Sequence, residues 1–183
     1  MHERVVAAAA ALTLEVGWAG VTMGKLADRV GVSRQTVYNE VGSKHQLAEE
    51  MVLTELTTFL AQVDAAFDRH PDDLVAAIRG AACGVLEIAQ SNALLQAVVS
   101  GSYGAATELL PLLTSRNDAL VLTATDAVRR RVLAYGLVID DRQLDAVIDM
   151  VVRLLLSHVV HPTGPPADTA DDIAWIVART LGP

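Results

Sequence analysis

Apolar residues recur at steps of three and four along most of this chain, which is the spacing of an amphipathic helix. Strand-like alternation of apolar and polar residues is absent from the sequence. The broadest apolar stripes lie in residues 44–69 and 141–160. The pattern therefore predicts an all-α protein of about nine helices.

Helix breakers and capping residues divide this pattern into segments. We expect helices over residues 3–16, 23–30, 34–41, 44–69, 74–90, 93–100, 117–134, 141–160 and 169–181. Thr22 caps the second of these helices and Ser33 the third. Either Asp72 or Asp73 caps the fifth, either Asp140 or Asp141 opens the eighth, and either Asp168 or Thr169 caps the last. A further short piece around residues 109–113 is irregular because it contains a proline.

Residues 21–47 predict two short helices joined by a tight turn, followed by the start of a third. Gly31 ends the first helix, because glycine adopts a left-handed conformation at little cost. The second helix has Val37 and Val41 as its clearly apolar positions, so its inward face is thin. Its remaining side chains suit the DNA major groove, where Arg pairs with guanine and Gln or Asn with adenine. These polar positions are Arg34, Gln35, Thr36, Tyr38 and Asn39.

A set of positions in this window resembles the helix-turn-helix domain of the TetR family of transcriptional regulators. The residues that carry the resemblance are Gly17-Trp18, Val21-Thr22, Leu26-Ala27, Gly31-Val32-Ser33, Thr36-Val37-Tyr38, Gly42-Ser43-Lys44 and Leu47. They cover roughly the first quarter of the chain. The resemblance implies a DNA-binding domain over residues 1–47 and a helical effector-binding and dimerisation domain over residues 48–183.

The candidate DNA contacts follow from the residue types and from the resemblance. We expect Arg34, Gln35 and Asn39 to contact bases. The resemblance implies phosphate contacts from Thr36, Tyr38 and Lys44. Thr22 adds a phosphate contact at a helix N-terminus, and Lys25 and Ser33 complete the set.

The charge of the chain is unusual for a DNA-binding protein, with a net value of −8 and an isoelectric point near 5.0. Residues 1–50 carry five basic and six acidic side chains, so their net charge is −1 and the remainder carries −7. Both lysines, Lys25 and Lys44, lie in the helix-turn-helix region. Affinity for DNA must therefore come from docking geometry more than from bulk charge.

The cellular setting follows from one cysteine and from the apolar runs. A single cysteine, Cys83, excludes an internal disulfide framework and fits a reducing cytoplasm. The most apolar late run, residues 151–160, is interrupted by Arg153, so we expect no membrane-spanning segment and no membrane partner. The interpretation is a cytoplasmic protein.

We expect a mainly aliphatic pocket in the second domain, which suggests a lipophilic effector such as a fatty acid, an acyl thioester or a hydrophobic drug. The small residues at 80–84 fit either close helix packing or room for such a ligand. Three consecutive arginines at 129–131 point in different directions, and at least two should be solvated or paired, for instance with Asp126. The expected pocket residues are Phe59, Val63, Phe67, Cys83, Leu86, Val99, Tyr103, Leu110, Leu113 and Val128, with Arg131 as an alternative anchor for a ligand carboxylate.

The last two helices form the expected dimer surface. In proteins of the TetR family these helices pair with their symmetry mates in a four-helix bundle, so the resemblance implies a homodimer. The alternative is that both apolar stripes close the core of their own subunit. The residues chosen are Leu144, Ile148, Val151, Leu155, Val159, Ile173, Ile176 and Val177.

No pattern for catalysis, metal binding or a cofactor stands out. A nucleophile elbow, a phosphate-binding loop and a dinucleotide fingerprint are absent from the sequence. His158 and His161 have ligand spacing but no evident third ligand. We therefore predict a ligand-responsive repressor, not an enzyme, that a lipophilic small molecule releases from a palindromic operator. The alternative is a DNA-binding regulator or activator without a small-molecule effector.

Overall fold

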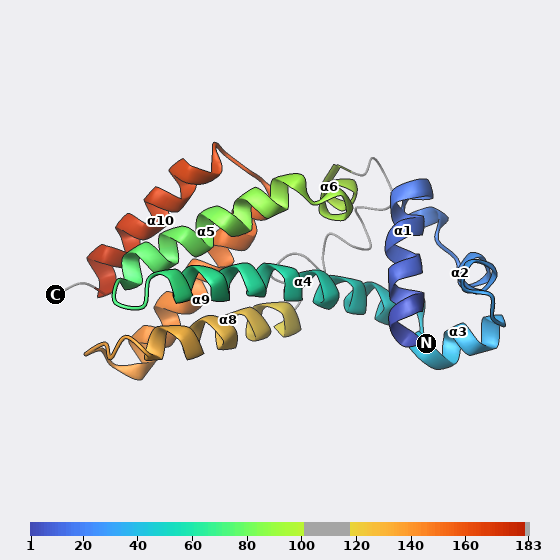
Figure 1. Cartoon of the computed structure of the whole chain (residues 1–183), viewed down its shortest axis with the longest axis horizontal. Helices are drawn as coiled ribbons and strands as arrows, with labels where there is room; N and C mark the ends of the chain where they lie inside the picture. The colour runs from blue at the N-terminus through green and yellow to red at the C-terminus, as the bar shows by residue number, and fades with distance from the viewer. Residues whose placement is uncertain (101–117, 182–183) are drawn as a thin grey trace. The chain divides into compact units, whose positions relative to one another are not determined.

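The computed structural model describes residues 1–100 and 118–181, and this part of the chain is entirely helical (Figure 1). The predicted all-α class is confirmed. The helices are α1 (His2–Gly20), α2 (Met23–Val30), α3 (Arg34–Val41), α4 (Lys44–Arg69), α5 (Leu74–Ser91), α6 (Ala93–Ser100), α8 (Asp118–Leu133), α9 (Asp141–Val160) and α10 (Pro166–Leu181).

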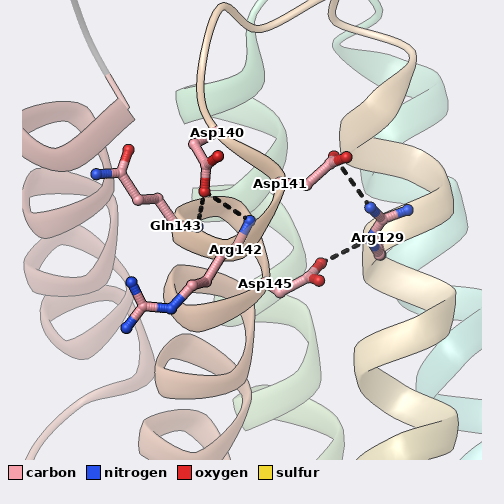
Figure 2. Close-up of polar contacts among 6 residues, drawn as sticks. All are labelled: Arg129, Asp140, Asp141, Arg142, Gln143 and Asp145. Carbon is pink, nitrogen blue, oxygen red and sulfur yellow. Dashed lines mark hydrogen bonds and ion pairs between the residues drawn. The ribbon is translucent and has the colours of Figure 1, made fainter.

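Side-chain caps begin several helices where the sequence predicted them. Thr22 accepts a hydrogen bond from the Lys25 amide at 3.3 Å, and Asp73, not Asp72, accepts one from the Ala76 amide at 2.9 Å. Asp140 accepts hydrogen bonds from the amides of Arg142 and Gln143 at the start of α9 (Figure 2). Each cap satisfies an amide that the first helical turn leaves without a partner.

Two helix ends differ from the prediction. The last helix begins at Pro166 rather than near Thr169, because proline lacks an amide hydrogen and its fixed φ suits the first helical turn. Thr169 lies inside α10 and is buried. Helix α1 continues to Gly20 beyond a break at Gly17, where φ is 72° and ψ is 158°.

The contacts group the described residues into two compact units. Unit 1 contains residues 1–55 and 92–100, and unit 2 contains residues 56–91 and 118–181. Helix α4 contributes to both units, since the division falls after Glu55. The DNA-binding domain was expected to end at residue 47. Unit 1 includes more of α4 than that domain does, and it also includes α6.

The core of unit 1 gathers apolar side chains from its helices around a buried tryptophan. Trp18 is 1% exposed, and Leu26, Val37 and Leu47 are fully buried. The thin apolar face of α3 therefore packs inward as predicted, through Val37 and Val41. Burial of such side chains contributes about 1.5–3 kcal/mol each, and this holds the short helices α2 and α3 in place.

Unit 2 is built around α5, which packs along α10 (Figure 1). Two glycines of α5 permit a close approach of α4. A Cβ atom at Gly80 would lie 3.5 Å from Cβ of Ala66, and one at Gly84 would overlap the side chain of Gln62. The small residues at 80–84 therefore serve helix packing.

Helix α5 is also the described helix that is long and apolar enough to cross a membrane, with a mean hydropathy of 1.3 over 18 residues. Half of these residues are buried inside the structure. The core helix of a soluble protein passes the same test of length and composition, and α5 packs against α9 and α10.

Candidate DNA-binding surface and apolar cavity

The turn between α2 and α3 is fixed by one glycine and one serine. Gly31 is left-handed, with φ 77° and ψ 40°, and its amide donates to the Ala27 carbonyl at 2.9 Å. The Ser33 hydroxyl then accepts a hydrogen bond from the Thr36 amide at 3.0 Å. This is the geometry that a helix-turn-helix requires, and it sets α3 directly after the turn.

Helix α3 turns its polar residues outward. Arg34, Gln35, Tyr38 and Asn39 are exposed, and Thr36 is half-buried. The Gln35 amide donates to Oδ1 of Asn39 at 3.0 Å, so these two side chains share one face of the helix. The structure thus brings the predicted base-contacting residues together on one exposed surface.

The first turn of α2 lies next to this surface. A Cβ atom at Gly24 would lie 3.9 Å from Cδ and Nε of Arg34, so the arginine passes close to the start of α2. Thr22 is exposed there. Lys25 is also exposed, and its ammonium donates to the Gly20 carbonyl at 2.8 Å. Free amides and the helix dipole favour an anion at such a position.

Lys44 has a structural role that the sequence did not indicate. Its ammonium donates to the Trp18 carbonyl at 3.0 Å and lies 4.8 Å from the centroid of the Trp18 ring. The half-buried Lys44 therefore joins the start of α4 to the end of α1. No local signal in the sequence pairs Lys44 with Trp18, whose carbonyl also accepts a hydrogen bond from the Val21 amide at 3.0 Å.

Ion pairs and carbonyl contacts join α1 to α2. Arg29 donates two hydrogen bonds to the Glu15 carboxylate, at 2.6 and 2.7 Å, and Arg4 donates to the Val30 carbonyl at 3.1 Å. The bonds from Arg29 lower the pKa of Glu15. Both partners are exposed, so screening by solvent keeps the contribution of the pair to stability small.

Unit 2 contains a small apolar cavity of about 50 Å³. Three of the predicted pocket residues line it, namely Val63, Phe67 and Val128. The others in its lining are equally apolar: Ile78, Ala81, Ala82, Val132, Val147, Ile148, Val151, Val152, Leu155, Val177 and Leu181. Such a lining excludes polar ligands, because a buried polar group would lack a hydrogen-bond partner.

Three other predicted pocket residues do not line this cavity. Leu86 is buried away from the cavity lining, and Phe59 and Cys83 are half-buried and do not line it. Cys83 donates to the Glu87 carboxylate at 3.5 Å, and burial, followed by this contact, raises the pKa of its thiol. The side chain of Val99 and the residues Tyr103, Leu110 and Leu113 lie outside the described part of the chain.

Arg131 belongs to a cluster that ties α8 to the end of α4. Its guanidinium donates to the Asp64 carbonyl at 3.2 Å, pairs with the Asp68 carboxylate, and lies 5.7 Å from the Phe67 ring centroid. The hydrogen bond to Asp68 raises the pKa of Arg131. Tyr135 donates to the carbonyl of His70 at 2.6 Å in the same region. These contacts favour the paired interpretation of Arg131 over that of a ligand anchor.

The neighbouring arginines are paired as well. Arg129 pairs with Asp145 at 2.6 Å and with Asp141 at 3.2 Å, which joins α8 to the first turns of α9 (Figure 2). Arg130 pairs with Asp126 one helical turn earlier, as the sequence suggested. All three arginines therefore have carboxylate partners.

The predicted dimer residues divide by burial. Leu144, Ile148, Ile173 and Val177 are buried in the core of their own subunit. Val151, Leu155 and Val159 are half-buried, and Ile176 is exposed. The apolar side chains that point outward from α9 and α10 include Met150, Leu154 and Trp175, with exposures of 69%, 37% and 62%. Helical periodicity selected mainly the stripe that faces the core, and the dimer surface stays a prediction.

The histidines near the end of α9 belong to no group of potential metal ligands among the described residues. Nδ1 of His158 lies 3.3 Å from the Thr163 hydroxyl. Within residues 1–100 and 118–181, no three His, Cys, Asp or Glu side chains are placed to hold a metal ion.

The fold and the exposed helix α3 define a helix-turn-helix regulator, and comparisons with known proteins identify its family. Residues 5–51 match the family described as bacterial regulatory proteins, tetR family, and residues 73–179 match the bacterial tetracyclin repressor, C-terminal domain. The chain belongs to the TetR family of bacterial transcriptional regulators, whose members are not enzymes.

Similar proteins are transcriptional regulators of this family. The HTH-type transcriptional regulator AlkX of Mycobacterium tuberculosis (strain ATCC 25618 / H37Rv) is 25% identical over 177 residues, which cover 97% of this chain and 83% of that protein. The crystal structure of the TetR family repressor AlkX from Dietzia sp. strain DQ12-45-1b, implicated in biodegradation of n-alkanes, aligns with a TM-score of 0.79. That alignment has 25% identity and covers 97% of this chain and 96% of the other. The R. erythropolis repressor QsdR has the same fold, with a TM-score of 0.65, 19% identity and coverage of 99% and 94%.

Proposed function

We propose that the chain is a homodimeric repressor that binds a palindromic operator through α3 and is released by a lipophilic small molecule. The observation that carries this proposal is the exposed face of α3 with Arg34, Gln35 and Asn39. In this proposal Arg34 pairs with guanine, and Gln35 and Asn39 pair with adenine. As a regulator that binds bacterial DNA, the protein acts in the cytoplasm.

Phosphate contacts surround these bases. Thr36 and Tyr38 flank the base-reading residues, while Thr22, Ser33 and Lys25 supply contacts from the turn and from the start of α2. The positive charge of Lys44 attracts the DNA phosphates at long range while its ammonium remains bound to Trp18.

The test is a gel shift with the DNA upstream of the coding region, using three variants. Arg34→Ala removes a bidentate base contact, so we expect a loss of about 1–3 kcal/mol and relaxed specificity at one base pair. Lys25→Ala should weaken binding to all sequences and reduce the salt slope by about 1. Arg142→Ala, an exposed arginine of α9, is the control and should bind as the wild type does. If Arg34→Ala binds normally, the assignment of α3 is wrong.

We propose that dimers form through the outward faces of α9 and α10. Met150 and Leu154 are exposed one turn apart on α9, and Trp175 and Ile176 are exposed on α10. Two-fold symmetry then places the recognition helices about 34–36 Å apart, or a multiple of this distance. Light scattering tests the interface: Trp175→Glu should yield monomers, whereas Trp175→Phe should remain dimeric.

The effector proposal depends on the cavity of unit 2. Every residue in its lining is apolar, and the AlkX repressor of Dietzia is implicated in n-alkane biodegradation, so we propose a lipophile such as a fatty acid or an acyl thioester. Benzene binds in an engineered apolar cavity of roughly 150 Å³. At about 50 Å³ the cavity must therefore expand when such a ligand binds. Helix α4 contributes to both units, so the proposed expansion lowers the population of the conformation that binds the operator.

A thermal-shift screen of fatty acids, acyl thioesters, alkanes and hydrophobic drugs tests this proposal. A ligand at 100 times its Kd stabilises the protein by about 2.7 kcal/mol, which raises Tm by roughly 5–11 °C for a chain of this size. The alternative is a regulator or activator without an effector. No stabilisation by any compound supports that alternative.

A further inference from the structure

His2, at the start of α1, connects three helices of unit 1. Its Nδ1 atom lies 2.8 Å from the backbone carbonyl oxygen of Glu40, in the last turn of α3. Its Nε2 atom contacts the carboxylate of Glu50, in the second turn of α4. One side chain thus joins the starts of α1 and α4 to the end of the recognition helix.

Both contacts require hydrogens on the ring. A carbonyl oxygen and a carboxylate oxygen accept hydrogen bonds but cannot donate them. A neutral imidazole carries one N–H group, whereas the protonated ring carries two. Both contacts are therefore hydrogen bonds at the same time in the cationic form, and one of them is lost when the ring becomes neutral.

The Glu40 carbonyl is a favourable site for a cation. The last four carbonyls of a helix lack partners within the helix, and the helix dipole places partial negative charge there. A protonated His2 therefore caps the C-terminus of α3, while Asn39, a predicted base contact, directly precedes Glu40 in the chain.

The charges around the ring favour the same protonation state. The carboxylates of Glu40 and Glu50 attract the cation, while Arg4 directs its guanidinium to the Val30 carbonyl and to Sδ of Met1. The hydrogen bond to the Glu40 backbone is the largest cause that raises the pKa of His2 above 6.5, opposed by desolvation and supported by Glu50. The contribution of the protonated His2 ring to the stability of unit 1 is present below pH 6.5 and is lost as the pH rises through the raised pKa of His2.

We propose that protonated His2 is a positioning residue for operator binding, which clamps the end of α3 to α1 and α4 and weakens its hold as the ring loses its proton. This inference rests on the proposed operator function. In this proposal the protonation of His2 changes operator affinity through the position of α3, without a contact between His2 and a base.

The first experiment follows the free protein, without DNA. We would titrate the imidazole resonances of the chain by NMR between pH 5 and 9, with any purification tag placed at the C-terminus. His45 is the matched control, because it is exposed and its Nε2 atom lies 3.5 Å from Glu49 on the same helix. The clamp predicts that the His2 midpoint lies above pH 6.5, that Glu50→Gln lowers the His2 midpoint and leaves the His45 resonances unchanged, and that the amides of Glu40 and Val41 shift with His2. A His2 midpoint at or below pH 6.5 overturns the proposal.

The second experiment measures operator affinity across the same pH range. Because the pair is exposed and screened by solvent, we expect only a modest effect, with the wild-type Kd rising about threefold more than that of His2→Gln. His45→Gln should follow the wild type. An equal pH dependence in the wild type and His2→Gln contradicts the clamp. If no operator is found, the proposed function fails while the NMR result still decides the protonation of His2.

A direct phosphate contact by His2 is the remaining outcome to separate. Neutralising a phosphate changes the slope of log K against log salt by about 0.9, so such a contact makes the slope itself vary with pH. The clamp predicts a slope that does not change with the protonation of His2. A pH-dependent slope that disappears in His2→Gln would assign the histidine to a phosphate and overturn the positioning role.

Discussion

Replacing Lys44 with methionine should destabilise the DNA-binding unit as well as weaken DNA binding. The resemblance to TetR-family domains implies that Lys44 contacts a phosphate, which by itself predicts an unchanged melting temperature. In the structure, however, the ammonium is bound to the Trp18 carbonyl and lies over the Trp18 ring. Methionine retains most of the apolar stem and removes both of these interactions.

The size of the effect follows from the two contacts. A cation over an indole contributes about 0.5–2 kcal/mol. A hydrogen bond to a charged group contributes about 1.5–3 kcal/mol. Because Lys44 is only half-buried and the two terms are not additive, we expect a combined loss of about 2 kcal/mol. For a chain of this size that lowers Tm by roughly 4–8 °C.

Tryptophan fluorescence can measure this change in unit 1 alone. The chain has two tryptophans, Trp18 in unit 1 and Trp175 in α10, so Trp175→Phe leaves Trp18 as the reporter. We would compare thermal melts of Trp175→Phe with those of the double variant that also carries Lys44→Met. Lys25→Met is the matched control, because Lys25 donates to the nearby Gly20 carbonyl but is exposed.

If Lys44→Met has the same Tm as the protein with Lys44 while its operator Kd rises tenfold or more, Lys44 has no structural role. Lys44 would then act on DNA alone, as the sequence suggested. An equal loss of Tm in Lys25→Met would also contradict this role, since the Trp18 ring would then contribute nothing specific.

Three further predictions concern a cap, the core and acid sensitivity. Ser33→Ala removes the acceptor for the Thr36 amide and should cost about 1 kcal/mol in urea unfolding, whereas Ser33→Asp should retain most of the stability. Phe67→Ala should cost about 3–5 kcal/mol and enlarge the cavity, so the variant should bind small apolar molecules more tightly in calorimetry. Glu15→Gln should flatten the loss of stability in acid: the lowered pKa of Glu15 means that its contribution is present above pH 4.5 and is lost as the pH falls further. Melting curves at pH 3–6 with and without 1 M salt check this, and an unchanged profile would contradict it.

Local signals in the sequence predicted the helices and the turn. Gly31, Ser33 and Asp140 act within their own few residues, so their roles follow from residue type and spacing. The same reasoning missed the start of α10, because Asp168 and Thr169 are stronger capping residues than the prolines before them.

Contacts between distant residues were not predictable in this way. Nothing in the order of residues pairs Lys44 with Trp18 or Arg131 with Asp68, because both pairs depend on how helices pack. The amphipathic stripes of the last two helices show a related difficulty. Periodicity finds the more apolar face, which closes the core here, whereas exposed residues such as Met150 and Trp175 interrupt a polar face.

The measurement that tests the account most directly is selection of bound sequences from a random duplex library, followed by titration of the enriched DNA across a salt series. The account predicts a palindrome whose half-site centres are about 10–10.5 base pairs apart, or a multiple of this, with affinity that survives moderate salt. It also predicts that Arg34→Ala loses preference at one position in each half-site. Enrichment of no sequence, with binding to every duplex that falls uniformly with salt, would contradict sequence recognition by α3.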